Sequence, residues 1–174
     1  LTQHAVPLTF GVKVASWIDG LVDARSAVVG ARDGLAMQLG GAAGTLAAAV
    51  ELTGSVGAAL DLVDRTAATL GLPSPPWHTS RARMTRTGDA LTTSADAWGR
   101  VAADVTTLSR PEIGELREGT GGGSSTMPHK SNPVLSVLLR RHAFAAPGLA
   151  STLHVAAGAA VDERPDGAWH AEWA

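Results

Sequence analysis

The segment from residue 121 to residue 133, GGGSSTMPHKSNP, concentrates the side chains best suited to chemistry. It offers hydroxyls at Ser124 and Ser125, an ammonium at Lys130 and an amide at Asn132. Lys130 lacks the preceding glycine of a phosphate-binding loop, and neither serine has the following glycine of a hydrolase nucleophile elbow. The residue three before Lys130 is methionine, which excludes a Ser-x-x-Lys pair. Anion binding is the chemistry that remains.

The position of this segment favours a carboxylate ligand. A helix is predicted to begin at Pro133 with Asn132 as its N-cap, and a helix N-terminus attracts anions through its unpaired N–H groups and its dipole. Lys130 adds a formal positive charge, and a charge-assisted hydrogen bond contributes roughly 1.5–3 kcal/mol. Glycines 121 to 123 would let the loop close over its ligand. A flexible linker before an ordinary capped helix is the alternative interpretation.

The elements around this segment are predicted to be helices. Apolar residues recur at spacings of three and four over residues 9–35 and 87–109. A third helix is expected over residues 55–70, with Gly71 as its C-cap. The last helix continues to about residue 160, and Pro147 with Gly148 should kink it rather than end it.

No segment alternates with the period of a strand, so the fold class is predicted to be all-α, a bundle of long helices. The sequence LGGAAG at residues 39–44 should break the first helix, and the three prolines of residues 72–80 predict a loop. The length of 174 residues suits a single helical-bundle domain over residues 1–174.

Composition limits the class of protein. Hydrophobic residues make up 45% and charged residues 17%, and the net charge is −2, so a globular chain without a nucleic-acid partner is expected. Cysteine is absent, which excludes disulfides, thiolate metal sites and a cysteine nucleophile. The longest uncharged run, residues 142–161, is rich in alanine and contains Pro147, so no membrane association is expected. The absence of a basic-then-apolar leader suggests a cytoplasmic protein.

No cluster of His, Asp and Glu has metal-ligand spacing, so neither a metal nor a cofactor is expected. Single histidines and arginines outside the loop also have predicted roles. His78 either packs or approaches the site, and His154 is predicted to be a core histidine. Arg140 and Arg141 are expected to form interhelical salt bridges in preference to substrate contacts.

The order of residues in the loop resembles a known superfamily. Gly123–Pro133 is similar at every fixed position to Gly-Ser-Ser-x-Met-Pro-x-Lys-x-Asn-Pro, the third shared region of the fumarase/aspartase superfamily. The opening LTQHAVPLTFG, Leu1–Gly11, resembles the second shared region. Leu1 stands where adenylosuccinate lyases have a histidine used in proton transfer.

A third stretch narrows the resemblance. DERPDGAWHAEW, residues 162–173, is similar to Glu-Arg-x-x-Gly-x-Trp-His-x-Glu-Trp in bacterial 3-carboxy-cis,cis-muconate cycloisomerases, which also lack a histidine at the Leu1 position. The resemblance implies conversion of 3-carboxy-cis,cis-muconate to 4-carboxymuconolactone in protocatechuate degradation, the β-ketoadipate pathway. It also implies a homotetramer with shared active sites that binds a small polycarboxylate. The chain would be the central part of a longer enzyme, without its N-terminal segment and C-terminal domain.

The resemblance also implies roles for individual residues. Ser124 would transfer the proton, and His4 stands where fumarases have an aspartate. The residues implied in substrate binding are Ser125, Met127, Lys130, Asn132, Gln3 and His4.

Two alternatives stay open at this point. One is another lyase of the superfamily, with adenylosuccinate lyase first. The other is a helical assembly fragment that performs no chemistry alone, since the chain contains parts of only two shared regions.

Overall fold

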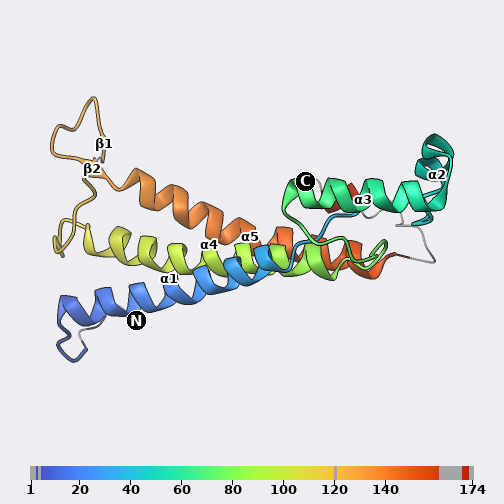
Figure 1. The fold of residues 1–174 in the computed structure, drawn as a ribbon. Coiled ribbons are helices and arrows are strands. Elements are labelled where there is room, and N and C mark those ends of the chain that lie inside the picture. The colour runs from blue at the N-terminus through green and yellow to red at the C-terminus, as the bar shows by residue number, and fades with distance from the viewer. Residues whose placement is uncertain (1–2, 4, 120, 161–169, 173–174) are drawn as a thin grey trace. The chain divides into compact units, whose positions relative to one another are not determined.

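The computed structural model describes residues 3, 5–119, 121–160 and 170–172. The described residues form five helices and one short antiparallel ladder (Figure 1). These elements are α1 (Phe10–Asp33), α2 (Ala47–Thr53), α3 (Val56–Leu70), α4 (Ala82–Leu108), β1 (Gly122–Gly123), β2 (Ser131–Asn132) and α5 (Val134–Gly158). The predicted all-α class is therefore confirmed.

The ends of α3 confirm the capping signals in the sequence. Ser55 lies in an extended conformation before the helix, and its hydroxyl accepts a hydrogen bond from Ala58 N at 3.2 Å. Gly71 adopts a left-handed φ of 66° after the last turn, and its N–H bonds to the carbonyls of Ala67 and Ala68. A residue with a Cβ would be strained at that φ, so the glycine is needed there.

Other boundaries differ from the sequence prediction. Helix α2 was not predicted, because seven residues are too few to show a helical period. Helix α4 begins at Ala82, five residues before the predicted start, since its first turns carry arginine and threonine rather than apolar residues. Helix α5 begins at Val134 and runs through Pro147 without ending, as predicted for that proline.

The chain divides into two compact units, each of which is described by itself. The first unit comprises residues 1–28 and 90–148, and the second comprises residues 29–89 and 149–174. The expectation of one domain over residues 1–174 stays a prediction.

In the first unit, α4 runs antiparallel to α1 and α5 (Figure 1). Trp17 on α1 donates its indole N–H to Asp104 on α4 at 2.7 Å, and Lys13 pairs with the same carboxylate at 3.1 Å. Gly99 on α4 leaves room for Ala143 on α5, because a Cβ at Gly99 would collide with the Ala143 methyl. These contacts hold the helices that lead into and out of the loop 109–133.

In the second unit, α2 packs on α3, and Glu172 contacts Arg81, the residue just before α4. Arg81 forms two hydrogen bonds to the carboxylate of Glu172, at 2.9 and 3.1 Å. Arg83 donates to the carbonyl of Gly34, after the end of α1. These contacts join three segments that lie far apart in the sequence.

The buried apolar residues of the described chain are all alanines: Ala24, Ala36, Ala59, Ala67, Ala90, Ala102 and Ala156. Because alanine has a single methyl group, helices with alanine contacts approach closely and leave the larger apolar side chains outside. Within the described residues, no helix has the length and hydropathy needed to cross a membrane.

Candidate active site

The base of the glycine-rich loop is an antiparallel ribbon. Gly122 pairs with Asn132, and Gly123 pairs with Ser131. A Cβ at Gly121 would lie 2.7 Å from Ser131 Oγ, and one at Gly122 would lie 2.5 Å from a methyl of Val134. Gly121 therefore leaves room for the opposite strand, and Gly122 leaves room for the first residue of α5, and neither is needed for a left-handed backbone.

Two of the predicted site residues lie directly beyond the last pair of this ribbon. Ser124 follows Gly123 on one strand, and Lys130 precedes Ser131 on the other. The ribbon therefore fixes the two ends of the turn that carries the hydroxyl and the ammonium. The sequence shows the spacing of these residues but not the pairing of the strands that flank them.

Backbone N–H groups surround the Ser124 oxygen. Ser124 Oγ accepts hydrogen bonds from Met127 N at 3.2 Å and from Thr126 N at 3.4 Å. The turn is closed by Lys130 N, which donates to the carbonyl of Met127 at 2.9 Å. Donors aimed at an oxygen stabilise negative charge on it, so these N–H groups are positioned to act on the Ser124 oxygen if it gives up its proton.

The other predicted site residues differ in their exposure and in their hydrogen bonds. Lys130 is exposed, and within the described residues its ammonium has no hydrogen-bond or ion-pair partner, which leaves it available to an anion. Asn132 uses one amide hydrogen inside the loop, donating to the carbonyl of Gly122 at 3.2 Å. Ser125, Met127 and Gln3 are exposed. His4 lies outside the described residues.

The N-terminus of α5 is already occupied by a carboxylate of this chain. Glu118 accepts hydrogen bonds from Leu135 N at 3.0 Å, from Ser136 N at 2.9 Å and from the Ser136 hydroxyl at 2.8 Å. The prediction that this helix terminus binds the substrate anion is therefore wrong in this structure. Asn132 is also not the N-cap, because it belongs to β2 and the helix starts two residues later.

The pKa of Glu118 reflects this environment. Desolvation acts to raise the pKa, but the Ser136 hydroxyl and the first backbone N–H groups of α5 outweigh it and hold the pKa below that of a free glutamate. Glu118 is therefore ionised at neutral pH, and sequence analysis missed it. No local capping pattern reveals the residue, because it lies 18 positions before Ser136.

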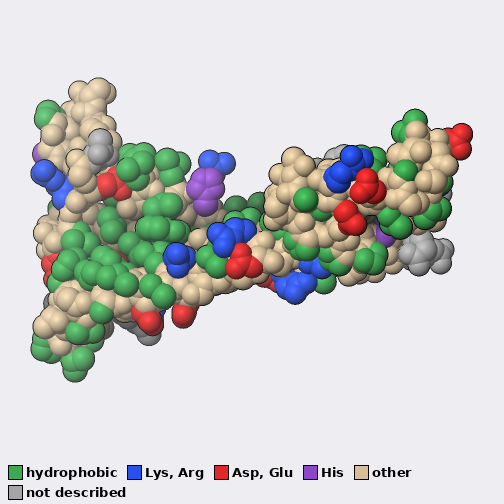
Figure 2. Space-filling view, in the orientation of Figure 1, with side chains coloured by type: hydrophobic (Ala, Val, Ile, Leu, Met, Phe, Trp, Pro, Cys, Tyr) green, Lys and Arg blue, Asp and Glu red, His purple; other side chains and the backbone are tan. Residues whose placement is uncertain are grey.

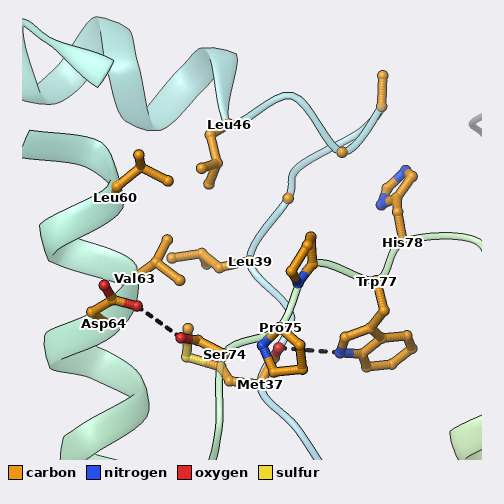
Figure 3. A pocket seen from close by; sticks show the side chains of 14 residues that line it. Met37, Leu39, Leu46, Leu60, Val63, Asp64, Ser74, Pro75, Trp77 and His78 are labelled. Atoms are coloured by element: carbon orange, nitrogen blue, oxygen red, sulfur yellow. Dashed lines mark hydrogen bonds between the residues drawn. The ribbon is translucent and has the colours of Figure 1, made fainter. Parts of the chain in front are cut away.

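A cavity of about 450 Å³ lies in the second unit, between α3 and the segments 37–46 and 74–78 (Figure 3). Its wall is mainly apolar, with one polar edge where Ser74 donates to Asp64 at 2.7 Å. Trp77 donates its indole N–H to the carbonyl of Met37 at 3.1 Å.

His78 lies at the rim of this cavity and packs against the glycine segment. A Cβ at Gly44 would come within 3.0 Å of the imidazole ring, and His78 Nδ1 shares a hydrogen bond with Gln38 at 2.9 Å. Its Nε2 is buried without a partner in the described part of the chain. The packing interpretation of His78 is therefore the one that this geometry supports.

Three residues of the last helix also had predicted roles. Arg140 donates to the hydroxyl of Thr106 on α4 at 3.4 Å and stacks over Phe144, so it makes an interhelical hydrogen bond in place of the expected salt bridge. Arg141 is exposed. His154 is not a core residue, because its side chain is 56% exposed and pairs with Asp89 at 3.0 Å. Among the described residues, no three His, Asp or Glu side chains are grouped so as to hold a metal ion.

Comparison with known proteins identifies the class. The model of the lyase family matches residues 1–148, and the chain belongs to this family. The resemblance seen in the loop is thereby confirmed at the level of the family.

Individual relatives carry more specific names than the family does. The chain is 45% identical over 177 residues to 3-carboxy-cis,cis-muconate cycloisomerase of Bradyrhizobium diazoefficiens, covering 98% of this chain and 38% of that protein. It is 44% identical over 180 residues to nitrosuccinate lyase of Streptomyces davaonensis, covering 99% of this chain and 38% of that protein. The crystal structure of 3-carboxy-cis,cis-muconate lactonizing enzyme from Pseudomonas putida matches with a TM-score of 0.82 and 37% identity, over 98% of this chain and 37% of that one. The chain thus spans under two fifths of the length of these relatives.

Proposed function

We propose that the complete protein is a cycloisomerase that converts 3-carboxy-cis,cis-muconate to 4-carboxymuconolactone. The observation that carries the proposal is the Ser124 hydroxyl, which has two backbone N–H groups at its oxygen, in a loop that also carries the exposed Lys130. The similarity to two cycloisomerases, one at 45% identity and one with a known structure, supports this choice.

The proposed reaction adds one substrate carboxylate across a carbon–carbon double bond. The new C–O bond leaves extra negative charge on the carbon chain and on its neighbouring carboxylate, and Ser124 donates a proton to that carbon. The Ser124 alkoxide that results is held by the N–H groups of Thr126 and Met127, and water then returns the proton. Lys130 would bind the carboxylate on which charge develops.

Turnover is tested by the ultraviolet absorbance of 3-carboxy-cis,cis-muconate mixed with the complete gene product. Lactonisation destroys the conjugated diene, so we expect the absorbance to fall at a rate proportional to enzyme concentration. An unchanged spectrum with folded protein would exclude the proposed substrate.

Nitrosuccinate is the second candidate substrate, because 44% identity to a nitrosuccinate lyase is close to the identity with the cycloisomerases. An elimination from nitrosuccinate would also remove a proton next to a carboxylate, and it would release nitrite. Measuring nitrite in parallel with diene absorbance separates the two. Adenylosuccinate is the third substrate for the same assay series.

We further propose that the protein assembles as a homotetramer in the cytoplasm, with each active site shared between chains. Large apolar side chains in the first unit support an assembly surface, because they are exposed and gather over its helices (Figure 2). They include Val12, Ile18, Val22, Leu135 and Phe144. Light scattering of the complete protein should give the mass of four chains, and a monomer at micromolar concentration would contradict the proposal.

A further inference from the structure

We propose that Glu118 is a positioning residue that holds the turn with Ser124 in place by fastening the chain before the glycine-rich segment to the first turn of α5. This inference rests on the proposed function, because it concerns how that active site is kept in shape. Among the described residues Glu118 is hydrogen-bonded to neither Ser124 nor Lys130, and it acts through the ribbon that precedes and follows them.

The fastening is a closed set of hydrogen bonds at the base of the loop. Glu118 precedes the glycine-rich segment 121–133, and its carboxylate binds the backbone of Leu135 and Ser136 after that segment. Ser136 is buried, with 6% of its surface exposed, whereas Glu118 is half-buried. The ribbon of residues 122–123 and 131–132 lies in the sequence between Glu118 and its two partners, so these bonds close the chain around the ribbon.

The three hydrogen bonds require an ionised carboxylate on a side chain as long as that of glutamate. Oε1 accepts two of the three hydrogen bonds, from the N–H and hydroxyl of Ser136, and Oε2 accepts the third, from Leu135 N. A glutamine at position 118 would turn an N–H group toward one of these donors, which would break at least one bond. An aspartate would be one methylene too short to reach both oxygen positions.

Loss of this fastening would affect the chemical step more than substrate binding. Proton transfer depends on the distance between the Ser124 oxygen and the reacting carbon, whereas Lys130 attracts a carboxylate over a longer range. A displacement of about 1 Å in a reacting group can cost about 100-fold in rate. We therefore expect Glu118→Gln to lower kcat about 10- to 100-fold while changing KM little.

The test compares Glu118→Gln with the matched variant Glu112→Gln in the complete protein. Glu112 lies in the same connection and is exposed, and the described residues show no hydrogen bond to its side chain. Steady-state kinetics with 3-carboxy-cis,cis-muconate give kcat and KM, and hydrogen exchange reports on the amides of residues 122–136. We expect faster exchange in that segment for Glu118→Gln alone, with α4 protected as in the wild type.

Each outcome decides the proposal. Unchanged exchange and unchanged kcat in a folded Glu118→Gln protein would overturn it, as would equal protection loss throughout the molecule. If the wild-type protein does not turn over the substrate, the proposed function fails, while the exchange of residues 122–136 still tests the fastening. If Glu118→Gln does not fold, Ser136→Ala removes only the hydroxyl bond and should produce the same effects more weakly. A Ser136→Ala protein indistinguishable from wild type would then count against the role of Glu118.

Discussion

Replacing Ser124 by alanine should lower kcat for 3-carboxy-cis,cis-muconate by about 10²- to 10⁴-fold, the usual contribution of a positioned acid or base. The change removes the oxygen that accepts N–H bonds from Thr126 and Met127 and leaves the backbone of the turn in place. KM should change little, since Lys130 keeps its charge. Diene absorbance under saturating substrate measures kcat, and circular dichroism confirms that the helices are intact.

Ser131→Ala is the matched control for this prediction. Ser131 lies in the same loop on β2 and is exposed, and the described residues show no hydrogen bond of its hydroxyl. We expect its kcat to stay close to that of the wild type. If Ser124→Ala were equally active, the proton would have to come from another group, and the assignment of Ser124 would be wrong.

Replacing Arg81 by methionine should destabilise the protein by about 3–5 kcal/mol, the typical result of breaking a buried ion pair. The side chains of Arg81 and Glu172 are only 9% and 3% exposed, so the change leaves a buried carboxylate without its charged partner. It also removes the hydrogen bond to the carbonyl of His78 and the stacking on Trp77. Thermal unfolding at one fixed protein concentration measures the loss, because assembly makes stability depend on concentration.

The second unit offers a matched control for this prediction in the pair Arg65–Asp61. Its members are 72% and 65% exposed, so Arg65→Met should cost at most about 1 kcal/mol. The double variant Arg81→Met with Glu172→Leu should recover part of the stability, because it removes the orphaned charge. If Arg81→Met and Arg65→Met unfolded at the same temperature, the ion pair between Arg81 and Glu172 would have no structural role.

Much of the helical fold could be predicted from the sequence, because the signals act over a few residues. Ser55 and Gly71 mark the ends of α3 through bonds to their own first and last turns. The apolar period fixed the middle of α1 and α4, while their ends depended on polar turns that carry no such period. The loop from Gly123 to Pro133 was recognisable because its residues are contiguous.

The surroundings of the site could not be predicted in the same way. His154 was expected in the core, but its partner Asp89 is 65 positions away and the pair is exposed. Arg81 gave no sign of its partner Glu172, because the two are separated by 91 positions. Which residues form such long-range pairs depends on how the segments pack, because the residue types alone are compatible with many partners.

The sequence by itself therefore determined the helices, the family and the identity of Ser124 and Lys130 as the residues to examine. The tertiary structure alone decided that Gly122 and Gly123 pair with Asn132 and Ser131, and that Glu118 rather than a ligand occupies the start of α5. The physical reason is the separation along the sequence over which each interaction acts. Capping and periodicity act within one or two turns, whereas a strand register and a carboxylate that bridges 18 positions exist only when the chain has folded back on itself.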